Sequence, residues 1–365
     1  MPGGALGAPG GDPAATAGVA AGRSGRARQL SARMVRRPEF GAAVSFIGVV
    51  VFFAVFTRGN GFLTLAGTAS WVNVAAELGI VAVPIGLLLI AGEFDLSIGA
   101  VTGAASIFTA VAATKANWPF WGAAGAAMAM SLLVGLANGT ILIKTRLPSF
   151  IVTLATWFTV AGLSLGLTRT ITGTTSVSLN VSGFAQVLFA GKMGQFNASV
   201  IWWLVITVVA AWILGHTRLG NWILATGGNV NVARAAGVPT DRVKLGLFVA
   251  ASGCAGILGI LQAVEYNGGN LTNGSNLVFD TLIAVIVGGA LFHGGYGSVV
   301  GLFLGTATYG IVDIGIFYTG WDSDYAQLFL GILLLGAVLG NSRVRAAVTK
   351  VRQPKARKEG EAAAS

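Results

Sequence analysis

The stretch VAAELGIVAVPIGLLLIAGEFDLSIGAVTGAASIFTAVAA, residues 74–113, decides the fold of this chain. It holds two apolar runs, 74–90 and 97–113, which are joined by the short polar segment 91–96. A membrane crossing needs roughly 20 mainly apolar residues, within a range of about 17–25, so each run is long enough to cross a bilayer. The stretch therefore predicts two transmembrane helices with almost no loop between them.

Apolar runs of similar length recur along the rest of the chain. They cover residues 41–57, 119–143, 150–167, 200–214, 245–264, 278–291, 298–318 and 326–340. The chain is 54% hydrophobic and only 10% charged, whereas a soluble domain carries about 25% charged residues. A soluble chain of this length could not bury so much apolar surface, but helices surrounded by lipid need not bury it. We therefore predict an all-α polytopic membrane protein with about ten transmembrane helices.

The Lys and Arg residues predict the orientation of these helices. In a soluble protein, a formal net charge of +10 would indicate nucleic-acid binding. Here, ten crossings that start inside place only Arg58, Lys115, Arg169 and Lys192 outside, and every other Lys and Arg inside. Basic residues concentrate in the cytoplasmic segments of membrane proteins. We predict a multi-pass protein of the cytoplasmic membrane, with both termini in the cytosol and with lipid, not nucleic acid, as its surroundings.

The composition divides the chain into three regions. Residues 1–40 are rich in Gly, Ala, Pro, Ser and Arg without an apolar period, which predicts a disordered basic cytoplasmic tail. No small-residue cleavage pattern follows the first apolar run, so this tail does not resemble a signal peptide. Residues 41–342 form the transmembrane domain, and residues 343–365 form a second basic cytoplasmic tail.

Motifs that would indicate catalysis are missing. The one Gly-Lys pair, Gly191-Lys192, is followed by Met193, so the chain lacks the loop that binds ATP phosphates. His216 and His293 are far apart and have no Cys or carboxylate neighbours, so neither a metal site nor a cofactor is expected. We predict that the protein is not an enzyme.

Small residues at helical spacing predict places where helices approach closely. Residues 162–166, GLSLG, match the nucleophile motif G-x-S-x-G, but they lie inside an apolar helical run, so a helix contact is the better interpretation. The G-x-x-x-G motif favours close helix packing in the same way. Its occurrences are Gly99/Gly103, Gly301/Gly305 and Gly336/Gly340.

Five carboxylates fall inside or beside the apolar runs: Glu77, Glu93, Asp95, Asp280 and Asp313. A carboxylate at mid-bilayer costs roughly 2.5–3.5 kcal/mol on insertion scales, so such residues face protein or water. Glu93 and Asp95 lie in the interruption near 91–97, where helix ends and free backbone groups can face a cavity. Asp95 either caps the next helix or belongs to a translocation path, and the two roles are compatible. Asp280 and Asp313 either bond to other helices or take part in transport.

A second interruption lies near 288–298, where the sequence reads GGALFHGGYGS. Transporters built from inverted repeats place equivalent helix breaks in their two halves. Pairing 288–298 with 91–97 is imperfect, because in a five-plus-five arrangement one break follows the second helix and the other follows the eighth. The sequence therefore suggests an internal duplication without settling its register.

The longest predicted inner loop, residues 215–244, contains signals for a short helix. Asn229 is a suitable N-cap, and residues 230–236 can form a short helix that ends at Gly237. Such a helix at the inner surface would either dock a cytosolic partner or rest on lipid headgroups.

Four segments together resemble the membrane permease subunits of monosaccharide ABC importers, of the ribose/xylose/galactose/arabinose type. They are residues 92–99 (GEFDLSIG), 147–156 (LPSFIVTLAT), 228–237 and 287–298, in the order found in that family. The resemblance spans roughly residues 41–342. One departure is the pair Glu93-Phe94 before Asp95, where the family more often has a single apolar residue.

The resemblance implies a permease homodimer, two cytosolic ATP-binding subunits, an extracytoplasmic sugar-binding protein and a monosaccharide substrate. It implies that the matching residues Asp95, Ser97 and Asn138 lie near the translocation path, to which the carboxylate argument adds Glu93 and Asp280. It also implies that five residues of the inner loop contact the ATPase. They are Gly228, Asn229, Ala233, Arg234 and Gly237.

These observations together predict the permease subunit of an ABC importer that carries a simple sugar by alternating access, driven by separate ATPase subunits. Three alternatives stay open. An ABC permease for nucleosides or autoinducers would share the same motifs. An ion-coupled secondary transporter of a small polar solute would use the buried carboxylates. A membrane-embedded transferase would need clustered carboxylates, and the one dense pair, in Asp322-Ser323-Asp324, is better explained as a solvated outer loop.

Overall fold

The computed structural model describes residues 38–352, with the side chains of residues 39–340. Most of the two predicted tails lies outside the described residues. The helices are α2 (Pro38–Phe56), α3 (Leu65–Ile90), α4 (Ile98–Thr114), α5 (Phe120–Thr145), α6 (Ser149–Thr172), α7 (Phe184–Ala190), α8 (Ala198–His216), α9 (Arg218–Gly228), α10 (Val230–Ala235), α11 (Thr240–Glu265), η1 (Leu271–Gly274), α12 (Leu277–Val287), α13 (Val299–Thr319) and α14 (Tyr325–Arg352). The strands are β1 (Ser176–Ser178), β2 (Lys192–Met193), β3 (Phe196–Asn197) and β4 (Gly268–Asn270).

Seven of the described helices are long and apolar enough to cross a membrane: α2, α3, α5, α6, α8, α11 and α13. Three shorter apolar helical segments, Ile98–Thr114, Leu271–Val287 and Tyr325–Gly340, account for the remaining predicted runs. An all-α polytopic membrane protein is therefore confirmed. The helices extend past several predicted runs, because polar residues such as Thr68 and Asn73 at the start of α3 interrupt the apolar pattern without ending the helix.

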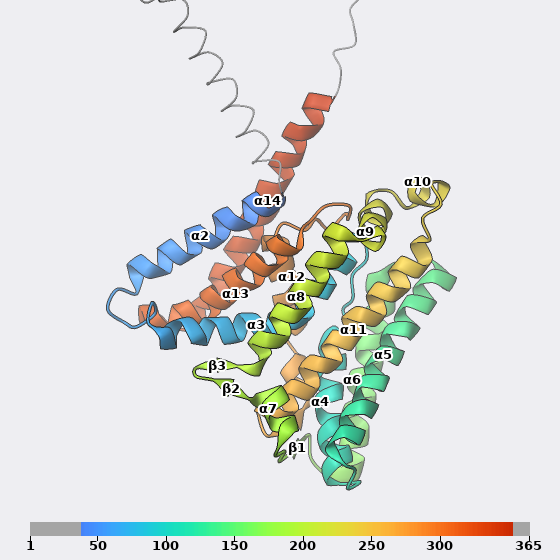
Figure 1. Ribbon diagram of the computed structural model, residues 1–365, viewed down its shortest axis with the longest axis vertical. Coiled ribbons are helices and arrows are strands. Elements are labelled where there is room, and N and C mark those ends of the chain that lie inside the picture. The colour runs from blue at the N-terminus through green and yellow to red at the C-terminus, as the bar shows by residue number, and fades with distance from the viewer. Residues whose placement is uncertain (1–37, 353–365) are drawn as a thin grey trace, which may run out of the picture.

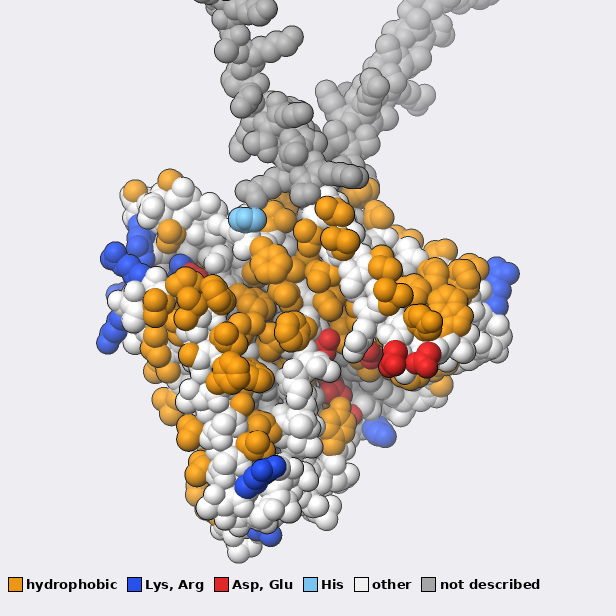
Figure 2. All heavy atoms as spheres, turned by 180° about the vertical axis from the view of Figure 1, so that it is seen from behind, with side chains coloured by type: hydrophobic (Ala, Val, Ile, Leu, Met, Phe, Trp, Pro, Cys, Tyr) orange, Lys and Arg blue, Asp and Glu red, His pale blue; other side chains and the backbone are white. Residues whose placement is uncertain are grey.

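The bundle is arranged around the buried helices α3, α4, α11 and α13. α3, α11 and α13 are mostly buried, whereas α2, α6 and α8 leave most of their surface open. The open surfaces carry large apolar side chains such as Val44, Phe158 and Val208. Figure 2 shows such side chains over the middle of one face, with Lys and Arg toward its edges. This pattern suits a lipid solvent, where outward-facing side chains need not be polar.

The two ends of the bundle differ in structure. α9 and α10 lie at one end, and β1 and α7 lie at the other (Figure 1). β1 pairs antiparallel with β4, which brings Val177 opposite Gly269, and β2 pairs antiparallel with β3. The sequence did not predict these strands, because segments of two or three residues show no periodicity.

Three segments without α-helix interrupt the membrane helices. The predicted breaks near 91–97 and 288–298 are present, between α3 and α4 and between α12 and α13. A third break, 266–276, lies between α11 and α12 and contains β4 and η1. It was not predicted. At the C-terminus, α14 continues as helix to Arg352, so the first ten residues of the predicted tail 343–365 are helical.

Candidate functional site

The first break is held by a chain of buried hydrogen bonds. Asp95 Oδ1 accepts hydrogen bonds from the Ser97 backbone N–H (2.8 Å) and from the Ser97 hydroxyl (2.6 Å). The Asn138 side-chain amide of α5 donates to Ser97 Oγ (2.9 Å), and Thr156 of α6 donates to Asn138 Oδ1 (2.6 Å). The chain therefore ties the start of α4 to both α5 and α6. We call these four residues the break network.

The backbone of the break is also bonded to α6. The N–H of Phe94 donates to Ser149 Oγ (3.2 Å), and the N–H of Leu96 donates to Thr153 Oγ1 (3.0 Å). A buried backbone donor without a partner is costly, so these hydroxyls permit a non-helical chain at this depth. This explains why residues 147–156 accompany the break motif: the second segment supplies the hydrogen-bond partners of the first.

Sequence analysis placed Asp95, Ser97 and Asn138 near a translocation path, and the structure brings all three together. Each is 0% exposed, so none of them contacts an open path in this conformation. Asp95 accepts from the N–H of Ser97, the residue just before α4, but no described side chain caps the N–H groups of the first turn of α4, so the capping role expected of Asp95 is not seen. Contact between these residues and a solute remains a prediction.

Glu93 and Asp280 lie apart from this network. Glu93 forms an ion pair with Lys244 of α11, and the two side chains are only 12% and 15% exposed respectively. Asp280 of α12 accepts a hydrogen bond from Tyr309 of α13 and lies near Asp313. The predicted path residues therefore fall in three places. Of the other buried carboxylates, Glu77 of α3 accepts hydrogen bonds from Gln262 (3.0 Å) and Tyr266 (2.9 Å).

We expect Thr156→Val to destabilise the fold by about 1–3 kcal/mol, because it leaves Asn138 Oδ1 buried without a donor. The control is Thr159→Val on the same helix, whose hydroxyl bonds only to its own helix at Ala155 O. Surface changes of that kind stay within about 0.5 kcal/mol. Thermal unfolding of the purified protein in detergent measures both, and equal melting temperatures would show that the network adds no stability.

Three segments meet through glycine backbones beside the break network. A Cβ atom on Gly227, at the end of α9, would lie 1.8 Å from Ile90 O. A Cβ on Gly294 would lie 2.8 Å from Gly92 Cα, and one on Gly295 would lie 2.7 Å from Gly228 Cα. The N–H of Gly295 donates to Ile90 O at 2.7 Å. We call these five glycines, 92, 227, 228, 294 and 295, the glycine junction, and at 227, 294 and 295 a Cβ atom would be too close to the facing backbone.

The inner loop contains the short helix that the sequence predicts. Asn229 Oδ1 accepts from the N–H groups of Asn231 (3.0 Å) and Val232 (3.1 Å), and α10 runs from Val230 to Ala235. Gly237 has φ of +82°, a left-handed conformation that suits glycine at a helix end. The preceding helix α9 was not predicted. It leads directly into α10, which begins two residues after Gly228 of the junction.

The residues that this loop exposes are not the same as the five residues that were expected to contact the ATPase. Gly228, Asn229 and Gly237 are exposed, but Ala233 is 4% exposed and cannot reach a partner. Arg234 donates to Thr240 Oγ1 (2.8 Å) and forms an ion pair with Asp241, which leaves its side chain 47% exposed. Val232, at 64% exposed, is the large apolar side chain that α10 presents outward, and the family motif did not single it out.

The predicted glycine contacts divide into two groups. Gly99, Gly103, Gly301 and Gly305 each pack against another segment, as expected. Around Gly162, Gly166, Gly336 and Gly340 a Cβ would meet open space, so the predicted contacts at α6 and α14 are absent from this chain's own fold. The motif fails there because these helix faces look outward from the bundle.

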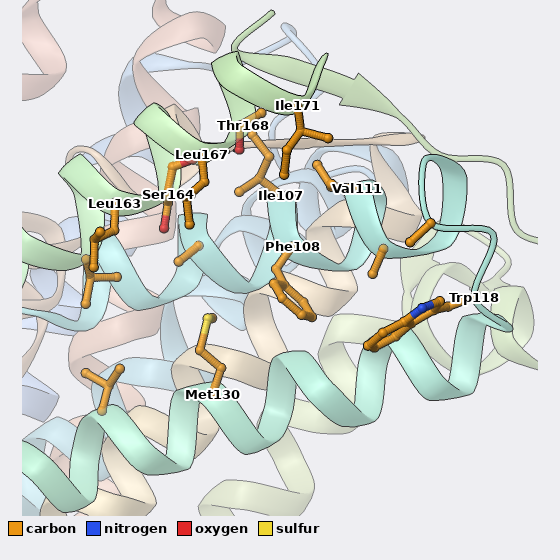
Figure 3. A pocket seen from close by; sticks show the side chains of 15 residues that line it. Ile107, Phe108, Val111, Trp118, Met130, Leu163, Ser164, Leu167, Thr168 and Ile171 are labelled. Carbon is orange, nitrogen blue, oxygen red and sulfur yellow. Dashed lines mark hydrogen bonds between the residues drawn. The ribbon is translucent and has the colours of Figure 1, made fainter. Parts of the chain in front are cut away.

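An apolar pocket of about 500 Å³ lies between α4, α5 and α6. Figure 3 shows Phe108, Met130 and Leu167 pointing into it from the three helices. Ser164 also lines this pocket, on an unbroken helix and without the strand–turn–helix setting that a nucleophile needs. Such an apolar space suits hydrocarbon chains and not a hydroxylated solute.

Residues 67–338 match the family described as branched-chain amino acid transport system / permease component. The chain belongs to this family. It is a permease subunit of a transport system, not an enzyme, and it is a multi-pass protein of the cell membrane.

Individual relatives confirm the resemblance to ABC importer permeases. The ribose import permease protein RbsC of Escherichia coli K12 is 27% identical over 304 residues, covering 82% of this chain and 93% of its own. The autoinducer 2 import system permease protein LsrD of Klebsiella pneumoniae is 30% identical over 270 residues, covering 73% and 80%. The fructose import permease protein FrcC of Rhizobium meliloti is 27% identical over 319 residues, covering 83% and 86%. No solved structure matches the chain.

Proposed function

We propose that this permease carries a simple sugar into the cell as part of an ABC importer. Two copies of the chain would form the pore, separate cytosolic ATPases would drive it, and an extracytoplasmic protein would deliver the sugar. The ten apolar helices α2, α3, α4, α5, α6, α8, α11, α12, α13 and α14 would each cross the membrane, with both termini inside. This orientation puts α9 and α10 at the cytosolic end of the bundle in Figure 1.

The glycine junction is the observation that carries this proposal. It joins α9, which leads into α10, to the breaks at 91–97 and 288–298 through backbone contacts and the hydrogen bond from Gly295 to Ile90. Backbone segments in contact cannot slide independently, because a packed interface shifts between discrete arrangements. A partner that moves α10 would therefore move both breaks, which is how ATP-driven closure of the ATPases would reach the pore.

The charge distribution supports a neutral solute. Among residues 39–340, every Lys and Arg lies near a helix end or in a connection, and Lys244 is paired with Glu93. A side-chain cation within the membrane region would favour the carboxylate of a zwitterionic amino acid, although a helix N-terminus can also bind that group. The named sugar-import relatives agree with a neutral polyol, while the family description leaves amino acids as the competing substrate class.

Reconstitution would test the proposed function. The tagged permease is purified from its own membranes together with its associated subunits and placed in vesicles with its binding protein. We expect an ATPase to co-purify, and we expect uptake of D-ribose or D-fructose that vanadate blocks and uncouplers leave unchanged. If the vesicles took up only leucine, adenosine or autoinducer 2, the assignment as an ABC importer would stand, but the proposed sugar substrate would be wrong. Absence of an ATPase would overturn the ABC assignment.

An ion-coupled transporter is the second candidate, supported by the polar contact between α12 and α13. Asp280, Tyr309 and Asp313 come together within the membrane helices, and membrane carboxylates commonly carry coupling ions. That mechanism predicts that this chain takes up solute without partner subunits, and that an uncoupler abolishes the uptake. Uptake that continues after Asp280→Asn and Asp313→Asn would remove it.

We expect Arg234→Glu to reduce ATPase association at least tenfold. The change places a carboxylate beside Asp241 and removes the bond to Thr240, so the end of α10 loses its attachment to α11. Arg242→Glu is the matched control, because it makes the same charge change at an exposed residue of the next helix, α11. Co-purified ATPase per permease is the measurement. Equal losses in the two variants would assign the effect to net charge.

A further inference from the structure

The third break, 266–276, repeats the first one. Residues 95–99 read Asp-Leu-Ser-Ile-Gly, and residues 270–274 read Asn-Leu-Thr-Asn-Gly. Asp95 Oδ1 accepts from the Ser97 N–H at 2.8 Å, and Asn270 Oδ1 accepts from the Thr272 N–H at 3.0 Å. In both segments a side-chain oxygen bonds the N–H two residues on, just before the chain becomes helical again.

The two motifs, 95–99 and 270–274, touch at their final glycines. A Cβ on Gly274 would lie 1.9 Å from Gly99 O, and a Cβ on Gly99 would lie 2.4 Å from Gly274 O. One turn further along α4, a Cβ on Gly103 would lie 2.4 Å from Leu271 O. The contact is therefore backbone against backbone, between equivalent positions of two similar motifs.

This contact corrects the register of the internal duplication. In the order of the ten apolar helices, 91–97 follows the second and 266–276 follows the seventh, as a five-plus-five inverted repeat requires. The break at 288–298 follows the eighth and is not the partner of 91–97. The fourth and ninth helices repeat as well: residues 135–140 read GLANGT and residues 301–306 read GLFLGT.

A pocket of about 170 Å³ opens where the two breaks meet. Gly99, Gly274 and Ala161 form part of its wall, and Trp157, Thr272 and Ser275 contribute polar groups. Within the described part of the chain, no hydrogen bond involves the Thr272 hydroxyl, the Ser275 hydroxyl or the Trp157 indole N–H. Since a water molecule takes up about 30 Å³ of liquid, the pocket holds about five or six waters or one small solute.

We propose that this pocket is where the transported solute contacts the permease, and that it takes a small, neutral, polyhydroxylated molecule. The inference rests on the proposed function and identifies residues within it. The Trp157 ring offers an apolar face for the C–H side of a sugar ring, and Thr272 and Ser275 offer hydroxyls for its O–H groups. The pocket has no charged wall residue. Its place, between the broken helices of two repeats, is where transporters bind solute.

The break network lies directly behind this pocket. Thr156 of the network precedes Trp157, and Ser97 and Gly99 are two residues apart at the start of α4. Asp95, Ser97 and Asn138 would therefore act by holding Gly99 and Trp157 in place, and not by touching solute. A change at the glycine junction would reach the pocket through residues 92–99, so the pocket would open and close with the ATPase cycle.

Transport kinetics of the complete importer in vesicles would test the pocket, with D-ribose and D-fructose as probes. We expect Thr272→Val and Ser275→Ala each to raise KM for the transported sugar about fivefold, and together at least tenfold, with the ATPase still bound. Trp157→Leu should raise KM further. Thr159→Val, on the other side of α6 and outside the pocket, should leave KM unchanged.

A substrate analogue provides a second measurement. If Thr272 and Ser275 bond sugar hydroxyls, the wild-type importer should prefer D-ribose over 2-deoxy-D-ribose, and the double variant should lose that preference. Unchanged KM and preference in the double variant, with sugar uptake intact, would overturn the pocket alone. Failure of the wild-type importer to take up any sugar would overturn the proposed function and this pocket's ligand together. Should Trp157→Leu fail to fold, the two hydroxyl variants decide.

Discussion

Gly227→Ala is expected to abolish uptake, or to reduce it at least tenfold, although alanine is the better helix former. Gly227 lies in α9, where replacing Gly by Ala ordinarily stabilises by about 0.5–1 kcal/mol. Here the new Cβ would lie 1.8 Å from Ile90 O and near the N–H of Gly295. Non-bonded heavy atoms sit about 3.5–4.0 Å apart at their optimum, so the backbone segments must separate.

Gly228→Ala is the matched control for this prediction. It lies next to Gly227 in the same helix, but a Cβ there has nothing within 4 Å. We expect it to retain uptake and to gain slightly in stability. Uptake and ATPase activity are measured on the same vesicles: loss of uptake with continued ATP hydrolysis would show that the junction transmits motion. Wild-type uptake by Gly227→Ala would contradict the junction.

Breaking the ion pair between Glu93 and Lys244 is expected to have the largest effect on stability. Because both side chains are nearly buried, Glu93→Gln leaves a lysine charge without a partner, which costs about 3–5 kcal/mol. The change also frees the break segment from α11. Chemical unfolding in detergent, followed by tryptophan fluorescence, gives the free energy.

Two further variants make this prediction specific. Glu93→Gln combined with Lys244→Met removes both charges, and we expect it to recover most of the lost stability, because no unpaired charge then remains. Asp241→Asn breaks the exposed pair with Arg234, in which the side chains are 47% and 49% exposed, and should cost at most about 1 kcal/mol. A double variant no more stable than Glu93→Gln would show that the pair itself does not account for the loss.

The helices could be predicted from the sequence because lipid imposes a length on them. Each apolar run coincides with a helix, and the errors are at the ends, as in α3, which begins at Leu65 and not near residue 74. The cap at Asn229 and the stop at Gly237 were predictable for another reason, since both act within a few residues.

Contacts between distant segments could not be predicted in this way. Ser97 and Asn138 are 41 residues apart, and Glu93 and Lys244 are 151 apart. The sequence marked Asp95, Ser97 and Asn138 as residues of interest through a family motif, but it could not show that they are buried and bonded to one another. It also assigned Ala233 to the partner surface, where the fold buries it.

The sequence by itself determined that this chain is a bundle of membrane helices, where those helices lie and where two of their interruptions fall, because the bilayer constrains each segment separately through its length and polarity. The tertiary structure decided which interruptions face each other. It placed the start of α4 against the segment 266–276 at Gly99 and Gly274, and it joined α9 to both Gly92 and Gly294. These pairings depend on backbone contacts between segments that are far apart in the chain. A glycine in the sequence allows a close approach but does not indicate which segment will approach it.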